Sequence, residues 1–80
     1  MKAKIHVTLK EGVLDPQGKA VARALGSLGF SGVHDVRQGK FIEVELGETD
    51  VDKARNSVDA MCRKLLANTV IEDYEIELVI

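Results

Sequence analysis

The stretch KAKIHVTLK, residues 2–10, alternates strictly between polar and apolar side chains. Successive side chains of a β-strand point to opposite faces of its sheet, so this alternation predicts a half-buried strand. The apolar side chains share one face, and they are Ala3, Ile5, Val7 and Leu9. The elements that follow determine how this strand is paired and covered.

A helix is predicted to begin shortly after the first strand. Asp15 is suited to accept a hydrogen bond from a free amide as the N-cap, and Pro16 fits the first helical position because no needed donor is lost there. Gly29 supplies a left-handed residue beyond the helix end, which lets Phe30 pack back on the helix. Between these ends runs an apolar stripe with helical spacing, formed by Val21, Ala24, Leu25 and Leu28.

Three more strands and a second helix are predicted in the remainder of the chain. Residues 33–36 and 41–46 flank Gln38-Gly39-Lys40, a short glycine-containing gap that is typical of an antiparallel hairpin. Thr49-x-x-Asp52 resembles a capping box, and an apolar stripe with helical spacing then continues to about residue 67, where Asn68 is suited to end the helix. Residues 74–80 alternate again and predict the last strand.

The predicted order is β-α-β-β-α-β, which we interpret as a single domain spanning residues 1–80. Such chains commonly fold as ferredoxin-like α+β domains, in which a four-stranded antiparallel sheet carries two helices on one face. The first strand would then lie between the third and the fourth. Its outward lysines would face glutamates on both neighbouring strands. Each such pair of opposite charges stabilises a sheet by about 0.2–1 kcal/mol. These residues are Lys2, Lys4, Lys10, Glu43, Glu45, Glu75 and Glu77.

The other face of this predicted sheet carries no helix. The apolar residues on or near that charged face are Phe41, Val79 and Tyr74. An uncovered face and two edge strands favour self-association, and a chain this small has reason to oligomerise. We therefore expect a homo-oligomer, a dimer or a tetramer.

The composition excludes several classes of protein. The chain has 13 acidic and 11 basic residues and a net charge of −2, which argues against a nucleic-acid-binding surface. No stretch approaches the roughly 20 apolar residues of a membrane span. Cys62 is the single cysteine, so no intrachain disulfide forms, and we expect a reducing, cytoplasmic location.

No motif in the chain predicts chemistry of its own. Residues 12–20 look like a phosphate-binding loop, but their glycine spacing is wrong and Ala20 stands where a magnesium ligand is needed. His6 and His34 lack metal-ligand spacing, and Cys62 is interpreted as a small buried hydrophobe. RNA-recognition domains of this fold stack bases on aromatic side chains of the third strand, whereas this chain has glutamates there, which repel phosphates. An acylphosphatase-like enzyme needs an anion-binding loop after the first strand, whereas this loop is acidic. We therefore expect no catalytic, cofactor-binding or metal-ligating residue.

Two stretches carry a resemblance to a known family. Residues 14–21, followed by Leu28-Gly29-Phe30 and by residues 36–40, form the first, and residues 62–74 form the second. The chain resembles the PurS family over nearly its whole length. One departure is Thr69, where the family usually has proline, and this difference bears on the rigidity of the turn before the last strand.

The resemblance implies a function that the residues alone do not. PurS proteins are the small subunit of phosphoribosylformylglycinamidine synthase in de novo purine biosynthesis, an amidotransferase complex that uses ATP, magnesium and glutamine. The small subunit would bridge the synthetase (PurL) and glutaminase (PurQ) subunits and support ammonia transfer, with no catalytic residues and no bound cofactor of its own.

Residues that match the family pattern without an evident core role are the candidate subunit contacts. They are Asp15, Gln17, Lys19, Arg37, Lys40, Asp73 and Tyr74. Each could instead cap or solvate its own turn. The competing class of function is a stand-alone dimeric regulatory module that binds a metabolite, and such a module predicts a ligand that raises thermal stability without any partner.

Overall fold

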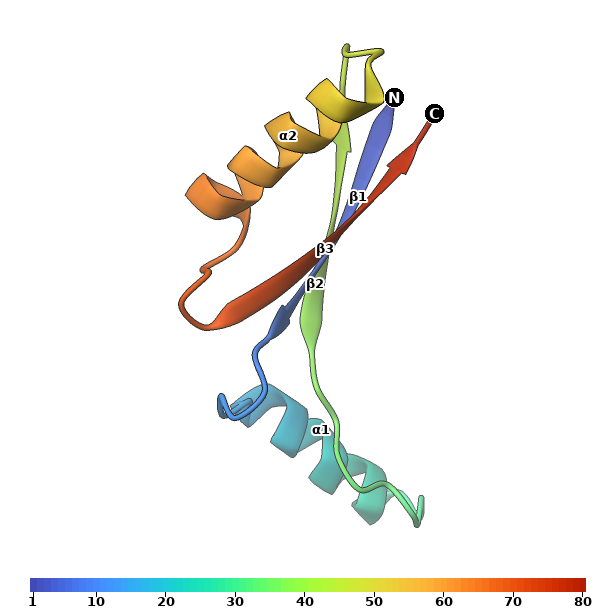
Figure 1. Cartoon of the computed structure of the whole chain (residues 1–80). Helices are drawn as coiled ribbons and strands as arrows, with labels where there is room; N and C mark the ends of the chain where they lie inside the picture. Colours follow the sequence, from blue (N-terminus) through green and yellow to red (C-terminus); the bar gives the residue numbers. More distant parts are fainter.

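The structure is a computed structural model that describes all residues 1–80. Its elements follow in the order β1 (Lys2–Leu9), α1 (Pro16–Ser27), β2 (Gly39–Glu45), α2 (Val51–Met61), the π-helical turn η1 (Cys62–Leu66) and β3 (Glu72–Val79). The three strands form one antiparallel sheet in the order β2-β1-β3 (Figure 1). No helix of the chain has the length and apolar character that crossing a membrane requires.

Strand β1 is the centre of the sheet, as its alternation predicts. Ala3, Ile5 and Val7 are fully buried on the inner face, which α2 covers. The flanking strands present half-buried apolar residues to the same core, and these are Ile42, Val44, Leu46, Tyr74, Ile76 and Leu78. A central strand with neighbours on both sides has its apolar face covered most completely, so the core is built around β1.

The outer face of the sheet carries the predicted charge pattern. Lys4 lies opposite Glu43 on β2 and Glu77 on β3. Lys2 lies opposite Glu45, and its Nζ makes an ion pair with Glu43 at 3.3 Å. Lys10 differs from the prediction, because it pairs with Asp73 beyond the end of β1.

Helix α2 and the turn η1 cover the inner face through three fully buried residues, Ala54, Val58 and Cys62. The burial of Cys62 confirms its interpretation as a small core residue. The N-cap is Asp50, whose Oδ1 accepts from the Lys53 amide at 3.1 Å, so the predicted Thr49–Asp52 capping box is wrong. No residue other than glycine has a positive φ, so Asn68 does not end the helix in a left-handed conformation.

Asn68 instead holds the turn into β3 without help from a proline. Its carbonyl oxygen accepts from the amides of Ile71 and Glu72, at 3.0 and 2.7 Å. Its Oδ1 accepts from the Val70 amide at 3.2 Å, and its own amide donates to Glu72 at 2.7 Å. Four hydrogen bonds thus restrain the turn that carries Thr69.

Helix α1 has the predicted ends but not the predicted place. Asp15 caps it, Gly29 has a φ of +95°, and the Phe30 amide donates to the Leu25 carbonyl at 3.1 Å. The helix lies beyond the end of the sheet instead of on the face beside α2 (Figure 1). The prediction of two helices on one face is therefore wrong for the single chain.

The predicted hairpin around Gln38-Gly39-Lys40 does not form either. Residues 30–38 run back along α1 and continue straight into β2 (Figure 1), so residues 33–36 form no strand and the sheet has three strands instead of four. Gly39 lies inside the sheet opposite Thr8, where an added Cβ would overlap the Val7 carbonyl oxygen. Close approach of two backbones, and not a turn, is the reason for this glycine.

The result is an elongated molecule with two parts. We call residues 11–38 the arm, and residues 1–9 with 39–80 the sheet unit. The chain extends over 48 × 25 × 15 Å, and both termini lie at the end of the sheet remote from the arm (Figure 1). The chain passes between the arm and the sheet unit twice, and the two connections lie side by side. We call this region the neck and define it as Leu9, Lys10, Asp15, Arg37 and Gln38.

Candidate subunit-contact site

The structure brings six of the seven predicted contact residues together around the neck. Asp15 and Arg37 belong to the neck itself, and Asp73 is tied to it through Lys10. Gln17 and Lys40 line a hollow beside it, and Lys19 lines another on the arm. Tyr74 lies apart, on the inner face of the sheet. Four of the six residues at the neck have partners that are far away in sequence, so the neck is a product of the fold.

Asp15 joins the arm to the strand that follows it. Its buried carboxylate accepts from the Gly18 amide through Oδ1 and from the Gln38 amide through Oδ2, both at 2.8 Å. These hydrogen bonds, that of Gln38 first, hold the pKa of the Asp15 carboxyl below its usual value. Gly18 permits the arrangement, because a Cβ there would overlap the Val36 carbonyl oxygen.

Arg37 closes the neck from the other side. Its Nη2 donates to the Leu9 carbonyl and, at 3.0 Å, to the Lys10 carbonyl. Both carbonyls lie where β1 gives way to the loop, so one guanidinium fastens the chain that leaves the sheet to the chain that returns. Hydrogen bonds to a charged donor are stronger than neutral ones. Asp15 and Arg37 therefore hold the direction in which the arm points.

A polar hollow of about 250 Å³ opens beside the neck, with Leu9 as its one apolar lining residue. Lys40 lies in it, 3.7 Å from Glu72 and 3.5 Å from the Leu66 carbonyl. Gln17 lines the same hollow from α1. Lys19, two residues further along the helix, lines a smaller hollow of about 80 Å³ together with Asp35 and Arg37. Gln17, Lys19 and Lys40 are exposed and form the outward part of the site.

Tyr74 has an internal partner. Its hydroxyl donates to Asp59 Oδ1 at 2.5 Å, and Arg63 Nε meets Asp59 Oδ2 at 2.9 Å. The hydrogen bond to Asp59 and burial raise the pKa of the Tyr74 phenol above its usual value. Tyr74 thus ties β3 to α2, and this tie accounts for its position without a partner protein.

Asp73 is the most exposed member of the set that has a charged partner. Lys10 Nζ lies 3.0 Å from its Oδ1, and both side chains are largely open to solvent. Exposed pairs of this kind contribute little to stability, at about 0–1 kcal/mol. Asp73 is therefore free to exchange its partner at modest cost.

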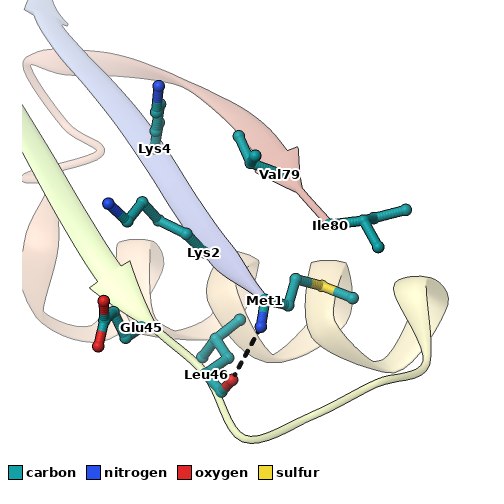
Figure 2. Close-up of a pocket in the computed structure, with 7 residues that line it drawn as sticks. All are labelled: Met1, Lys2, Lys4, Glu45, Leu46, Val79 and Ile80. Atoms are coloured by element: carbon teal, nitrogen blue, oxygen red, sulfur yellow. Dashed lines mark hydrogen bonds between the residues drawn. The ribbon is translucent and has the colours of Figure 1, made fainter.

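A second surface was not predicted from the sequence. At the end of the sheet near the termini, Lys2, Lys4, Glu45, Leu46 and Val79 surround a hollow of about 500 Å³ together with both terminal residues (Figure 2). The amino group of Met1 donates to the Leu46 carbonyl at 3.3 Å. The one sequence signal for this surface is Val79, an apolar residue on an otherwise charged face.

The thiol of Cys62 is poorly placed for chemistry. It is fully buried, and burial together with the nearby Asp59 carboxylate raises its pKa. The thiolate is the reactive form of cysteine, so this thiol is inert. No group of three or more His, Cys, Asp and Glu side chains is arranged to hold a metal ion.

The fold defines a class: a small, elongated α+β protein in which a hydrogen-bonded neck joins a helical arm to a three-stranded antiparallel sheet. The family model described as "PurS: Phosphoribosylformylglycinamidine (FGAM) synthase" matches residues 2–80. The PurS subunit of that synthase from Bacillus subtilis is 54% identical over 76 residues, which cover 95% of this chain and 89% of the relative. The chain belongs to the PurS family, the PurS subunits of FGAM synthase.

Solved structures agree with this assignment. The crystal structure of PurS from Methanocaldococcus jannaschii, a subunit of formylglycinamide ribonucleotide amidotransferase, is similar with a TM-score of 0.85 and 46% identity, covering 95% of this chain and 92% of that one. A chain of the PurLQS structure from Thermotoga maritima is similar with a TM-score of 0.86 and 34% identity, covering 95% and 93%. Similarity over nearly full length on both sides indicates that the elongated fold belongs to the family.

Proposed function

We propose that the chain is the non-catalytic small subunit of FGAM synthase that bridges the synthetase (PurL) and the glutaminase (PurQ) and supports ammonia transfer between them. The observation that carries the proposal is the likeness over 95% of the chain to a subunit of the PurLQS structure. In this proposal residues 1–80 act as one unit, self-associated as a dimer or tetramer, in the cytoplasm where the lone thiol stays reduced.

The residues of the proposed contact site have two different roles. Asp15 and Arg37 use their hydrogen bonds to fix the arm, so they act by positioning. Gln17, Lys19 and Lys40 are exposed beside them and are the side chains that would touch PurL or PurQ. Asp73 would join them by leaving Lys10, and Tyr74 would act only by holding β3 against α2.

ATP, magnesium and glutamine belong to the whole complex in this proposal, and this chain binds none of them. The hollow at the termini is lined by lysine, glutamate and apolar residues, and the hollow at the neck by acidic residues, glutamines, Lys40, Gly39 and Leu9. The polar residues of the neck already use their hydrogen bonds on one another. Support for chemistry by the partner subunits therefore comes from geometry, namely from the distance and orientation that the scaffold fixes.

The test is an assay of FGAM formation by the matching PurL and PurQ, with and without this chain. We expect the chain to restore glutamine-dependent turnover and to change ammonia-driven turnover little. Equal glutamine-dependent rates without the chain would contradict the proposal. A thermal-shift screen of the isolated chain tests the alternative, a stand-alone metabolite-binding module, because a ligand that binds the native state raises Tm without any partner.

Variants separate the two roles of the contact residues. The triple variant Gln17→Ala, Lys19→Ala and Lys40→Ala should weaken copurification with PurL and PurQ and leave the circular dichroism spectrum unchanged. A matched control, Lys53→Ala with Arg55→Ala, removes two exposed basic side chains from α2. Unchanged assembly by the triple variant, or equal loss by the control, would contradict the assignment of the neck.

A further inference from the structure

The outer face of the sheet is not covered by any helix of the chain. Helix α2 and the turn η1 lie on the inner face, and the arm lies beyond the end of the sheet (Figure 1). The registers of the two strand pairs fix which outward side chains are neighbours, and they arrange them in four rows across the sheet. From the termini towards the neck, the rows are Glu45, Lys2 and Val79; Glu43, Lys4 and Glu77; Phe41, His6 and Glu75; and Gly39, Thr8 and Asp73.

This outer face carries more negative than positive charge. Its rows hold five carboxylates and two lysines, and Lys10 adds a third positive charge from beyond the end of β1. Two of the four ion pairs of the chain lie on this face, and they join Lys2 to Glu43 and Lys10 to Asp73. The other carboxylates of the face make no ion pair within the chain, and they are Glu45, Glu75 and Glu77.

The third row combines an exposed aromatic ring with one of these unpaired carboxylates. The Phe41 ring is 54% exposed, and its centroid lies 4.8 Å from that of the His6 ring. His6 is exposed although it belongs to the central strand, and the exposed Glu75 lies opposite it on β3. Gly39, the outward residue of β2 in the next row, has no side chain that could cover the Phe41 ring. The row therefore presents an open pair of rings beside a carboxylate.

An arginine side chain matches this combination. Its guanidinium is planar and permanently charged, stacks on aromatic rings and donates two parallel hydrogen bonds to a carboxylate. Neighbouring strands lie about 4.8 Å apart, so a guanidinium over the rings of Phe41 and His6 is within reach of the flexible Glu75 side chain on the next strand. A cation over an exposed ring strengthens binding about two- to fivefold. Lysine, with its compact ammonium, matches the row less well because it neither stacks nor forks.

The charge of the outer face argues against other occupants. The phosphates of a nucleic acid or of an anionic lipid would approach carboxylates that no lysine of the chain neutralises. A two-fold contact between two copies would place this patch against itself, and its surplus of negative charge makes such a contact repulsive. The occupant that complements the face is a basic polypeptide segment.

We infer that the outer face of the sheet is a docking surface for a basic segment of a different protein, in which one arginine lies over the ring pair of Phe41 and His6 and is hydrogen-bonded to Glu75. Glu45 and Glu77 in the adjoining rows would attract further basic residues of the same segment. This surface is distinct from the neck, because none of its rows contains a residue of the neck.

Peptide titration followed by NMR tests the docking surface in the full chain. The probe is a capped Gly-Arg-Gly-Arg-Gly peptide, and the comparison peptide has lysine in place of arginine. We expect the arginine peptide to shift the ring signals of Phe41 and His6 and the amide signal of Glu75. It should bind about threefold more tightly than the lysine peptide. Phe30, the other phenylalanine, lies on the arm and its ring signals should not move.

Variants with matched controls provide the second measurement. Phe41→Leu removes the ring and Glu75→Gln removes the charge, and each should weaken binding of the arginine peptide at least about twofold. Phe30→Leu is the control for the ring, because Phe30 is 59% exposed, and Glu11→Gln is the control for the exposed carboxylate. Neither control should change the affinity. Circular dichroism verifies that all four variants fold.

The same titrations contain the results that would overturn the inference. Equal binding of the two peptides, or equal effects of test and control variants, would show only a general attraction between charges. Adenosine that shifts the Phe41 and His6 signals more than the arginine peptide does would assign the face to a nucleobase. Shifts of these signals on dilution of the chain without peptide would assign it to a contact between copies. Each of these results contradicts docking of an arginine-bearing segment.

Discussion

The sheet unit and the arm are stabilised by different forces. The sheet unit contains every buried apolar residue of the chain, with Ile5, Val7, Val58 and Cys62 as its largest fully buried side chains. The arm has two buried residues, Asp15 and Gly18, and neither contributes an apolar side chain. The sheet unit is thus held by removal of apolar surface from water, and the arm by the hydrogen bonds of one carboxylate and one guanidinium. An element without its own core depends on its attachment and on what other chains cover.

The largest expected effect is on the core of the sheet unit. Ile5→Ala truncates the largest fully buried side chain of β1 and should lower the free energy of unfolding by about 2–5 kcal/mol, because it leaves a cavity as well as losing apolar burial. Urea unfolding followed by circular dichroism measures this. Ile80→Ala, at a position 96% exposed, is the matched control and should change the free energy by less than about 0.5 kcal/mol.

A small effect of Ile5→Ala would contradict the view that the sheet unit is stabilised mainly by its own apolar core. It would mean that removal of apolar surface from water within the chain is not what mainly stabilises the sheet unit. The experiment is therefore done at several protein concentrations. Concentration dependence of the midpoint would show how much association contributes.

The second effect is on the attachment of the arm. Gly18→Ala places a methyl group against the Val36 carbonyl oxygen and should cost about 1–3 kcal/mol, as overpacking does. Gly26→Ala in the same helix has open space around it and should instead stabilise by up to about 1 kcal/mol, because alanine favours helix more than glycine. Both are measured by urea unfolding. Equal effects at the two positions would show that the arm tolerates displacement at the neck.

The sheet unit was largely predictable from the sequence, and the arm was not. Alternation in β1 and β3 specifies which face is buried, and the structure confirms it. The apolar stripe of the second helix is confirmed at Ala54, Val58 and Cys62, whereas Val51 and Leu65, which have the same helical spacing, are exposed. Gly39 was misleading, because a glycine between two apolar runs fits a turn and a close backbone contact equally well. Residues 33–36 have valine at both ends but no strict alternation, so the prediction of a strand there depended on the glycine-containing gap that follows them.

The contact residues illustrate the same limit. The sequence marks Arg37 and Tyr74 as residues without a core role, but their partners lie 27 residues or more away in the first case and 15 in the second. Such pairings follow from the fold and not from local spacing. One interaction of Asp15 could be predicted, because the helix-capping hydrogen bond from the Gly18 amide joins residues only three apart. Its second bond, to Gln38, was not predictable in the same way.

The third effect concerns the arm in acid. The pKa of Asp15 is lowered in the folded chain, so its contribution to stability is complete above the unfolded pKa of about 3.9 and is lost as the pH falls through the folded value. Asp15→Asn should therefore destabilise the chain at pH 7, and the difference from the unmodified chain should shrink below about pH 4. Urea midpoints at pH 7, 5 and 3 measure this.

Glu11→Gln is the control for the acid experiment. Glu11 is an exposed carboxylate of the same loop, so its substitution should leave the midpoint at pH 7 unchanged. A difference between Asp15→Asn and the unmodified chain that stays constant from pH 7 to pH 3 would show that the negative charge is not what holds the neck.

The smallest effect is a spectroscopic shift in the sheet unit. Tyr74 is the single tyrosine, so its phenolate absorbance is read without interference. Its folded pKa is raised, so its contribution to stability is present below the unfolded pKa of about 10 and is lost as the pH rises through the folded value. Native titration should have a midpoint above about 10. Asp59→Asn should lower this midpoint, and Asp52→Asn, on the exposed side of α2, should not.

This titration also separates the two parts of the molecule. Gly18→Ala strains the neck but touches nothing near Asp59, so it should leave the Tyr74 midpoint where it is. If Gly18→Ala moved that midpoint as much as Asp59→Asn does, the arm and the sheet unit would be one cooperative body. If it did not, the tie between β3 and α2 would persist while the arm is displaced, as expected of an arm that has no core of its own.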